Sequence, residues 1–296
     1  MVVRAAAVLL VLDVMAARAQ QPTVELRDTA VLSAPRLGES SGVTPSRRSG
    51  VYWSLNDSGD GPILYATDSA GRDLGHVTVL GAQNIDWEDL SAGPCPRTAG
   101  RCLFAGDIGD NSARRSSIFI YAVPEPAPPR QAADTLRGAT IEMAFEFRYP
   151  DRPHDAEGLA VLSDGRFLLV TKDLFGAPRL YEGSVRSPQR SDTLHFIGTL
   201  AMPTSAVTGR IVTGAAVSPD GRILVVRTYV TLHFFRLGGQ GVPESIGRIG
   251  GIGIPVVEAQ GEGVCFDGPD ALVLTSERGS RRHAILTRLR VGGLRE

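Results

Sequence analysis

The most regular feature of the chain is a pair of short apolar runs joined by a tight turn. Between His154 and Asp173, the apolar segment 159–162 is followed by a Ser-Asp-Gly-Arg turn and by a second apolar segment, 167–170. Asp-Gly between two apolar runs is a strong signal for a β-hairpin. Polar and acidic residues collect at both open ends of this hairpin. The pattern therefore predicts two antiparallel strands whose open ends carry the candidate chemistry.

The same pattern occurs five times along the chain. The copies begin at Glu39, Asp86, His154, Val212 and Gln260, and their spacing of roughly 45 to 70 residues is that of propeller blades. Two more strand-like runs follow each of the first four copies, but only one, residues 284–291, follows the fifth. The missing fourth strand is available in residues 23–33. We therefore predict an all-β fold, a β-propeller of five four-stranded blades closed by this N-terminal strand.

Six blades are the alternative, if the long interval between the second and third copies contains an extra unit. We interpret the Pro-rich stretch 124–138 in that interval as a loop between outer strands. Gly and Pro interrupt every segment that is long enough for an amphipathic helix, so no helix is predicted. Residues 20–296 are expected to form a single propeller domain.

The first 19 residues have the features of a signal peptide. Arg4 precedes the apolar run 5–12, and Ala17-Arg18-Ala19 supplies a small-x-small cleavage pattern. No later stretch approaches the roughly 20 apolar residues of a membrane span. We expect an exported protein, periplasmic or extracellular, with no integral membrane segment once the signal is removed.

Export makes disulfide bonds possible. Cys95 and Cys102 flank a short polar loop and are predicted to form one, with two free loop thiols as the alternative. Cys265 lies in an apolar context, where burial as a small apolar residue is expected. Because no second Cys or His pair has ligand spacing, zinc is not expected.

Composition and charge restrict the partners. The chain has 296 residues with 43% hydrophobic and 21% charged residues, which is ordinary for a globular protein. A formal net charge of −1 argues against nucleic acid and against an anionic membrane surface as general partners. Of the 31 basic residues, only Lys172 is a lysine. We expect a monomer that binds a small anionic or ester substrate.

The propeller fold predicts which polar residues meet. The first strand of each blade lines the central channel and the second runs antiparallel beside it, so the start of the first and the end of the second lie at the same rim. The groups placed on this face are Glu39, Ser40, Asn56, Asp57, Glu88, Asp89, Asp107, Asp110, His154, Asp155, Glu157, Lys172, Asp173, Thr213, Arg227, Glu262, Glu277 and Arg278. The sequence therefore predicts an acid-lined mouth of the channel.

Such a mouth restricts the chemistry. Several carboxylates within a narrow space repel one another, so they must be protonated, paired with cations or bound to a metal. Calcium suits them because it accepts about six to eight oxygen ligands in flexible geometry, whereas zinc, copper and iron would require more His or Cys. The predicted metal ligands are Glu39, Glu88, Asp89, Asp107, Asp155, Glu157 and Glu262.

Four residues are predicted to act in catalysis. Glu157, set between small residues at a strand start as Glu262 is, would serve as a ligand or general base. His154 would carry a proton, with a solvated loop histidine as the alternative. Lys172 and Arg227 would orient an anionic group.

Some of the acidic residues have a simpler explanation. Asp is common in tight turns because its side chain bonds to the local backbone. For Asp57, Asp60 and Asp110 a turn role and a site role are both open. Asp164 and Asp220 lie in turns at the opposite rim and are assigned to structure.

Several segments carry a resemblance to a known group. "NDSGD", "DWEDL", "GDIGDN", "HDAEGL", "VTGAAVSPDG" and "QGEG" together resemble a group of exported bacterial propellers similar to the SdiA-regulated periplasmic proteins and to the esterase-like, phytase-like propellers. The resemblance covers most of the mature chain and implies an acid-lined, metal-binding propeller. By position, Glu157 and Glu262 resemble the channel-mouth carboxylates that hold calcium in β-propeller phytases. The "DDPAIW"-type phytase signature is absent and the mouth has few basic residues, so phytate is not the expected substrate.

Two functions are consistent with these observations. The first is a calcium-dependent hydrolase that acts on a phosphoester, ester or lactone. The second is a non-catalytic propeller of the cell envelope that binds a ligand or a protein. We favour the hydrolase because the acids converge instead of spreading over the surface.

Overall fold

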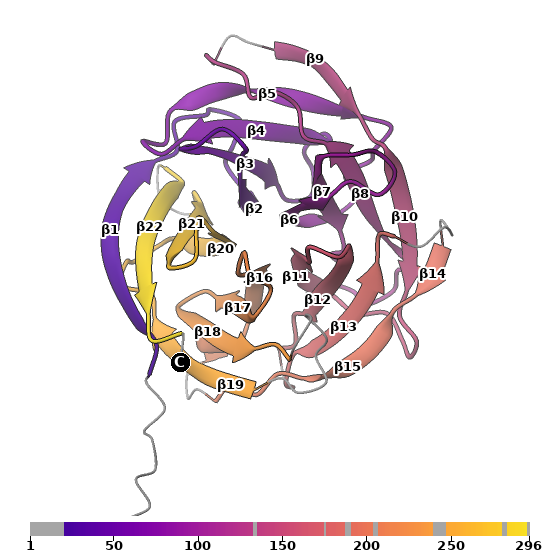
Figure 1. Ribbon diagram of the computed structural model, residues 1–296, viewed down its shortest axis with the longest axis vertical. Helices are drawn as coiled ribbons and strands as arrows, with labels where there is room; N and C mark the ends of the chain where they lie inside the picture. The colour runs from indigo at the N-terminus through magenta and orange to yellow at the C-terminus, as the bar shows by residue number, and fades with distance from the viewer. Residues whose placement is uncertain are drawn as a thin grey trace, which may run out of the picture.

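The strands of the protein form five sheets arranged around a central axis, as a β-propeller (Figure 1). The computed structural model describes residues 21–132, 135–174, 176–186, 191–203, 207–238, 247–279 and 283–294. Within these ranges the single helical element is one 3-10 turn, η1 (Val207–Gly209), and no helix has the length and apolar character to cross a membrane. The predicted five-bladed, all-β fold is confirmed and six blades are excluded. The predicted signal peptide, residues 1–19, lies outside the described residues.

Each blade has four antiparallel strands that follow one another from the channel outward. Blade one contains β2 (Ser40–Pro45), β3 (Val51–Asn56), β4 (Ile63–Asp68) and β5 (Asp73–Leu80). Blade two contains β6 (Trp87–Pro94), β7 (Arg101–Asp107), β8 (Ile118–Pro124) and β10 (Met143–Arg148). Blade three contains β11 (Ala156–Val161), β12 (Arg166–Thr171), β13 (Arg179–Ser184) and β15 (His195–Thr199). Blade four contains β16 (Val212–Val217), β17 (Ile223–Thr228), β18 (Thr231–Arg236) and β19 (Gly247–Gly253). Blade five contains β20 (Gln260–Phe266), β21 (Ala271–Glu277), β22 (Ile285–Gly292) and β1 (Thr23–Val31).

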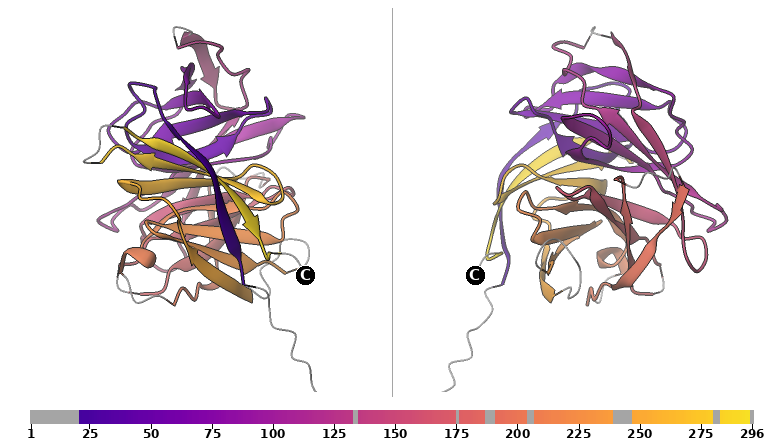
Figure 2. Two further views of the ribbon diagram at one scale, coloured as in Figure 1. Left: turned by 90° about the vertical axis from the view of Figure 1, so that its left-hand side faces the viewer. Right: turned by 45° about the vertical axis from the view of Figure 1, so that its right-hand side comes forward.

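Blade five joins the two ends of the chain. β1 pairs antiparallel with β22 from Thr23 opposite Gly292 to Val31 opposite Ile285, and Figure 1 shows β1 outside β22 at the rim. In the left view of Figure 2 the indigo strand β1 runs beside the yellow strand β22 along the outside of the molecule. The predicted closing strand is confirmed, and it ends two residues earlier than expected. Pairing one terminus with the other closes the ring without leaving an inner sheet edge open.

Blades one and two each receive a fifth strand from the blade that follows. β9 (Thr135–Thr140) pairs parallel with β5, and β14 (Ser191–Thr193) pairs parallel with β10. One expectation was therefore wrong in detail, since the end of the Pro-rich stretch 124–138, expected to be a loop, is a strand. The physical reason is that each added segment covers the outer edge of a neighbouring sheet.

Burial decreases from the channel to the periphery. All six residues of β11 are buried, whereas in the outer strand β10 buried Met143, Phe145 and Phe147 alternate with more exposed residues. Strands buried on both faces are continuous apolar runs, while strands with one wet face alternate. Neighbouring blades pack through such residues, for example Phe147 of blade two against the ring of Phe167 of blade three at 4.9 Å. This packing holds the inner strands in fixed positions around the channel.

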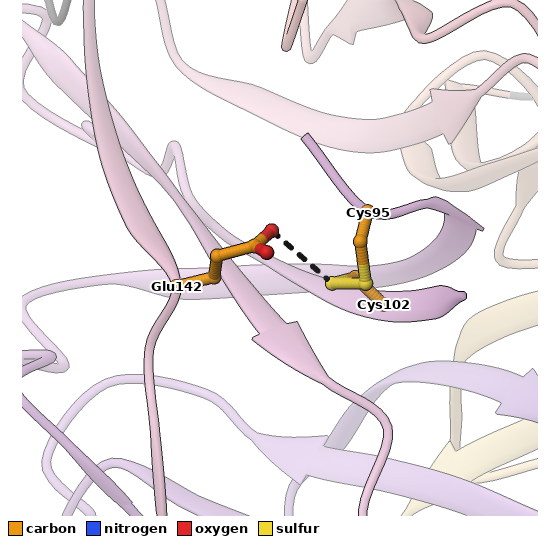
Figure 3. A group of neighbouring side chains, drawn as sticks. All are labelled: Cys95, Cys102 and Glu142. Carbon is orange, nitrogen blue, oxygen red and sulfur yellow. Dashed lines mark hydrogen bonds between the residues drawn. A yellow bond between two sulfur atoms is a disulfide. The ribbon is translucent and has the colours of Figure 1, made fainter. Parts of the chain in front are cut away.

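The disulfide prediction is confirmed. Cys95 and Cys102 are bonded at the turn between β6 and β7, and Glu142 Oε2 lies 3.8 Å from Cys102 Sγ (Figure 3). The Glu142 carboxylate also accepts the N–H of Thr98 at 2.8 Å. Because the two sulfurs are bonded to each other, this group is a loop anchor and not a metal site. Cys265 is buried and free, as expected.

Candidate functional site

Every inner strand has a β-bulge near its start. The strand register shifts between Ser40 and Gly42, Trp87 and Asp89, Ala156 and Gly158, Val212 and Gly214, and Gly261 and Val264. An extra residue in a bulge is left unpaired, and its side chain can be aimed away from the sheet. One residue of each blade is thereby placed at the mouth of the channel. We call these five residues the bulge ring: Ser41, Glu88, Glu157, Thr213 and Glu262.

The residue after each bulged residue packs against another inner strand. It is a glycine in four blades, and a Cβ on Gly158 would lie only 2.7 Å from the Cβ of Ala215. Blade two has Asp89 at this position instead. Asp89 Oδ2 accepts the N–H of Leu159 at 2.8 Å and of Ala215 at 3.3 Å, and Oδ1 accepts that of Leu90 at 2.8 Å. Asp89 therefore ties blades two, three and four together beside the bulge ring, and burial raises its pKa to about 8.

Two overlapping groups of carboxylates lie at the mouth. Asp57, Asp86 and Glu88 offer oxygens that all lie within 4.8 Å of one another, and so do Glu88, Asp155 and Glu157. Glu88 belongs to both groups. Asp86 was not among the predicted site residues, although its place in "DWEDL", two residues before Glu88, is a usable signal. The structure therefore gathers acids of blades one, two and three around one buried glutamate.

Burial and mutual repulsion determine the protonation of these acids. Burial, with repulsion from Glu157, raises the pKa of Glu88 well above its ordinary value. Burial raises the pKa of Glu157 to about 7, although Lys172 Nζ lies 2.5 Å from Glu157 Oε1 and attracts its negative charge. Burial and the charge of Asp57 raise the pKa of Asp86 to about 6. Glu88 and Glu157 are hydrogen-bonded to each other, so their proton affinities depend on one another.

A second acidic side of the mouth comes from blade five. Burial and repulsion from Glu157 and Glu277 raise the pKa of Glu262 well above its ordinary value. The pKa of Glu277 is raised to about 7 by burial, and Gln260 Nε2 donates to its Oε1 at 2.9 Å. Burial and the charge of Glu262 raise the pKa of Tyr229 to about 12. The acids of the bulge ring thus interact across the mouth, and Tyr229 lies within their electrostatic reach.

Lys172 has the place that the sequence predicts. Its side chain is 19% exposed and its ammonium contacts Glu157. For Lys172 the attraction of Glu157 outweighs the cost of burial, so the pKa of Lys172 is raised. The lysine therefore stays charged and supplies a cation to the acidic mouth at every physiological pH.

Arg227 is buried inside the wall between blades four and five. Its Nη1 donates to the carbonyl oxygens of Gly263 at 2.6 Å and Thr275 at 2.8 Å, and its Nη2 pairs with Glu258. The side chain is fully buried. These contacts join β17 to the inner strands of blade five and position the bulge that carries Glu262.

Two other predicted ligands lie outside both carboxylate groups. Asp107 is fully buried, and its Oδ1 accepts from Arg115 Nη1 at 2.8 Å and from the N–H of Asp86 at 3.0 Å. It thereby holds the segment that leads into β6. Glu39 is exposed, and its backbone N–H donates to Asn56 Oδ1 at 3.1 Å.

His154 lies beside the mouth, in a cleft of about 220 Å³. Its Nε2 is 2.8 Å from the hydroxyl of Tyr181 and 3.0 Å from Asp151 Oδ2, and burial lowers the pKa of His154. Burial favours the neutral ring against the attraction of Asp151, and the two partners fix the orientation of the ring. The cleft is lined by Asp110, Asn111, Ala113, Arg152, His154, Asp155, Lys172, Asp173 and Leu174.

The acids for which a turn role was open divide between the two roles. Asp60 accepts from Tyr65 Oη at 2.6 Å, from Asn56 Nδ2 at 2.8 Å and from the N–H of Gly61 at 2.8 Å, so its oxygens serve the loop. Asp57 belongs to the first carboxylate group, and its Oδ1 also accepts the N–H of Ser58. The number of hydrogen bonds to the side chain, which the sequence does not display, separates the two residues.

Two larger hollows lie along blade five, away from the mouth. They measure about 520 and 620 Å³ and share Asp270 and Arg290 in their walls. Several of their charged groups are paired with one another, as in Arg288 Nε with Asp28 Oδ1 at 2.8 Å. We therefore place the candidate site at the mouth, where carboxylates of several blades converge.

Comparisons with known proteins support the fold. No protein-family model matches the chain, and no curated protein matches its sequence. The allergen Mala s 1 of Malassezia sympodialis is similar over 90% of this chain and 96% of its own, with a TM-score of 0.57 and 12% identity. The PQQ-bound aldose sugar dehydrogenase of Streptomyces coelicolor covers 92% of this chain and 99% of its own, with a TM-score of 0.49 and 12% identity. Both are β-propeller proteins, and at this identity the similarity to Mala s 1 concerns the fold alone.

Proposed function

We propose that the protein is an exported, calcium-dependent hydrolase that cleaves a small phosphoester, ester or lactone at the mouth of its channel. The observation that carries this proposal is the convergence of five carboxylates in two groups that share Glu88. The motifs that resemble the SdiA-regulated and phytase-like propellers favour the same class of protein, and membership in that group is part of the proposal.

The donor set fits calcium. Calcium is held by about six to eight oxygen ligands in flexible geometry, and carboxylates supply such oxygens. The oxygens of each carboxylate group lie within 4.8 Å of one another. All the donors in the two groups are hard carboxylate oxygens, without the imidazole or thiolate that zinc or copper would favour. We propose that Glu88 binds the ion together with Asp57, Asp86, Asp155 and Glu157.

A bound calcium ion would polarise a carbonyl or phosphoryl oxygen and lower the pKa of a bound water. The chain's own residues would supply orientation and proton transfer. Lys172 holds a positive charge beside Glu157, where it would orient an anionic substrate group. Glu157 belongs to the second carboxylate group and would act as a ligand of the ion or as a general base.

We propose positioning roles for the buried residues around the mouth. Asp89 and Arg227 fix the inner strands that carry the bulge ring. Asp107 orders the segment that presents Asp86. His154 shapes the cleft next to Asp155, because both of its observed partners hold its Nε2.

A panel of substrates tests the proposal. Turnover of p-nitrophenyl phosphate, p-nitrophenyl acetate and a γ-lactone is measured in calcium, in magnesium and after chelation. We expect calcium-dependent turnover of at least one substrate and its loss in Glu88→Gln, while Glu25→Gln, which removes an exposed acid on β1, behaves as wild type.

A thermal scan tests metal binding separately. A ligand at 100 times its dissociation constant stabilises a folded protein by about 2.7 kcal/mol, which is on the order of 5 °C for a chain of this size. We expect this shift with calcium. If calcium shifts the wild-type transition no more than magnesium does, and chelation changes nothing, the metal site does not exist.

A non-catalytic binding propeller is the second candidate. The side chains of His154 and Arg227 are engaged in structural hydrogen bonds, so neither reaches a ligand in the mouth. A mouth without these two predicted catalytic residues can still bind a ligand, which favours this candidate. A calcium-dependent thermal shift without turnover of any substrate would support this candidate over the hydrolase.

A further inference from the structure

The end of the channel opposite the mouth is a hollow built by all five blades. It has a volume of about 260 Å³, and every inner strand supplies part of its wall. One wall residue from each blade in turn is Val43, Leu90, Val161, Ala216 and Phe266. We call this hollow the channel base. A second hollow of about 410 Å³ adjoins it, since Arg101, Val161 and Val217 are among the residues that line both. Sites for small molecules measure about 300 to 1,000 Å³, so the adjoining hollows offer a space of that size.

Asp89 lies between the channel base and the acidic mouth. Along β6, Glu88 belongs to the mouth, Asp89 follows it, and Leu90 is already in the wall of the channel base. The carboxylate of Asp89 accepts N–H groups of β6, β11 and β16, so it joins three inner strands at this level of the channel. The channel base is therefore a separate place with its own chemistry.

The walls of the channel base are mostly apolar and carry one kind of charge. Leu90, Val264 and Phe266 are buried parts of the wall. Among the described residues, Arg101 is the single charged residue in the walls of the two adjoining hollows, and neither wall contains an Asp or a Glu. The channel base thus differs from the mouth in its apolar surface and in the sign of its charge.

Arg101 is held in place and keeps N–H groups for a ligand. Its Nη1 donates to Glu125 Oε2 at 2.5 Å, and its Nη2 donates to the carbonyl oxygen of Pro45 at 2.5 Å. A guanidinium group has five N–H groups. These two bonds use two of the five, so three have no acceptor in the described part of the chain, and the side chain is 26% exposed. The bond between Cys95 and Cys102 closes the turn next to Arg101 and limits its movement.

The group around Arg101 has a surplus of positive charge. Glu125 accepts from Arg47 Nε at 3.2 Å and from Ser46 Oγ at 2.8 Å in addition to Arg101. Burial would raise the pKa of Glu125, but the hydrogen bonds from Arg47 and Ser46 and the charge of Arg101 lower it below its ordinary value. The carboxylate is therefore ionised. Two guanidinium groups around one carboxylate leave one positive charge over, which a monoanion matches.

We propose that the channel base binds a small monocarboxylate with an apolar body, whose carboxylate accepts from Arg101 while its body lies against Val161, Val217 and Phe266. A contact between arginine and a carboxylate is charge-assisted and specific in geometry, and burial of the body against apolar walls supplies further affinity. A phosphate group is a poorer match, because its charge of about −1.5 to −2 exceeds the surplus and would remain partly unpaired against apolar walls. The site is independent of the proposed hydrolase, since neither calcium nor the mouth takes part in it.

Three probes separate the two halves of the proposed ligand. 2-Naphthoate has the carboxylate and an apolar body, 2-naphthalenemethanol has the body without the charge, and acetate has the carboxylate without the body. Their affinities for the purified protein are measured by calorimetry in chelator. 2-Naphthoate should bind at least about tenfold more tightly than either of the others, because a hydrogen bond to a charged group is worth about that factor or more. Equal affinities for 2-naphthoate and 2-naphthalenemethanol, or no binding of 2-naphthoate, would overturn the proposal.

Variants test the contact with the carboxylate. Arg101→Gln should weaken binding of 2-naphthoate at least about tenfold and leave that of 2-naphthalenemethanol unchanged. Arg97→Gln is the matched control, since Arg97 is exposed in the neighbouring turn and lines neither hollow, and it should change neither affinity.

A second pair of variants leaves Arg101 in place and decides the question if Arg101→Gln does not fold. Val217→Asp and Val217→Asn have side chains of nearly equal volume, so the difference between them measures the charge in the wall. 2-Naphthoate should bind more weakly to the Asp variant than to the Asn variant, and 2-naphthalenemethanol should bind equally to both. Equal affinities of the two variants for 2-naphthoate would refute the charge complementarity.

A crystal soaked with 6-bromo-2-naphthoate shows where the probe lies. We expect the anomalous signal of bromine between Val161, Val217 and Phe266, and a bromine atom at the mouth or in the hollows along blade five would overturn the proposal. Glu88→Gln, which alters the mouth, should leave the affinity for 2-naphthoate unchanged. Loss of the hydrolase proposal would therefore leave this site standing, and the reverse also holds.

Discussion

Glu262→Gln tests whether the bulge ring is destabilised by its own acids. Glu262 is 4% exposed, and burial together with repulsion from Glu157 and Glu277 raises its pKa. Above the ordinary value of 4.5 the unfolded chain releases this proton while the folded protein keeps it. Folding then has to take up a proton, so the metal-free protein loses stability as the pH rises. Glutamine has nearly the same volume, resembles the protonated acid and does not titrate.

The size of the effect follows from the proton difference. One proton bound by the folded state alone changes the free energy of unfolding by about 1.4 kcal/mol per pH unit. Between pH 5 and pH 7 the variant should therefore gain up to about 2.7 kcal/mol over wild type. With roughly 2 to 4 °C per kcal/mol for a chain of this size, we expect a melting temperature about 5 °C higher than wild type at pH 7 and little difference at pH 4.5.

The assay is thermal unfolding in chelator at several pH values, with Glu25→Gln as the control. The control removes an exposed acid from β1 and should follow wild type throughout. In calcium the gain should be smaller, because the proposed ion would offset the repulsion between Glu157 and Glu262. The reasoning fails if the gain is the same at pH 4.5 and pH 7, or if the variant is less stable than wild type at pH 7 without metal.

Three further variants test the roles assigned above. Lys172→Met should weaken binding of an anionic substrate about tenfold and affect the free energy of unfolding little at pH 6, because Glu157 can take up a proton. Equal losses of binding free energy and of unfolding free energy would make Lys172 a structural counter-ion. Arg227→Met should lower the free energy of unfolding by about 3 to 5 kcal/mol in denaturant titrations, since it leaves Glu258 buried and unpaired. A loss below 1 kcal/mol would contradict the role of Arg227 in joining blades four and five. Replacing Cys95 and Cys102 by serine opens a short loop and should cost about 2.5 kcal/mol, with unchanged denaturation arguing that the bond is dispensable.

The architecture was predictable because it repeats. Five copies of one hairpin pattern indicate five blades, and the fifth copy lacks a strand that residues 23–31 supply. β9 and β14 were not predictable in the same way. Each is stabilised by pairing with the edge of another blade, so its signal lies in contacts between distant segments and not in its own periodicity.

The site was predictable as a face of the molecule but not in its detail. The alternation of strands places the acids at one rim, and Glu88, Asp155 and Glu157 do meet there. The alternation of strands does not distinguish an acid whose carboxylate oxygens are free from one whose oxygens accept hydrogen bonds. Asp89 follows Glu88 in the sequence, yet three backbone N–H groups hold its carboxylate. Arg227 likewise lies near the mouth end of β17, but its side chain points into the wall between blades four and five.

The bulges explain how one repeated backbone yields an asymmetric site. Each blade presents one side chain to the bulge ring, and these side chains are serine and threonine in blades one and four but glutamate in blades two, three and five. The ring alone therefore has three acids. The two carboxylate groups arise because the loops before β6 and β11 add Asp86 and Asp155 next to Glu88 and Glu157, and the loop after β3 adds Asp57. The cleft beside His154 opens next to this concentration of charge, as Asp155 and Lys172 in its wall show.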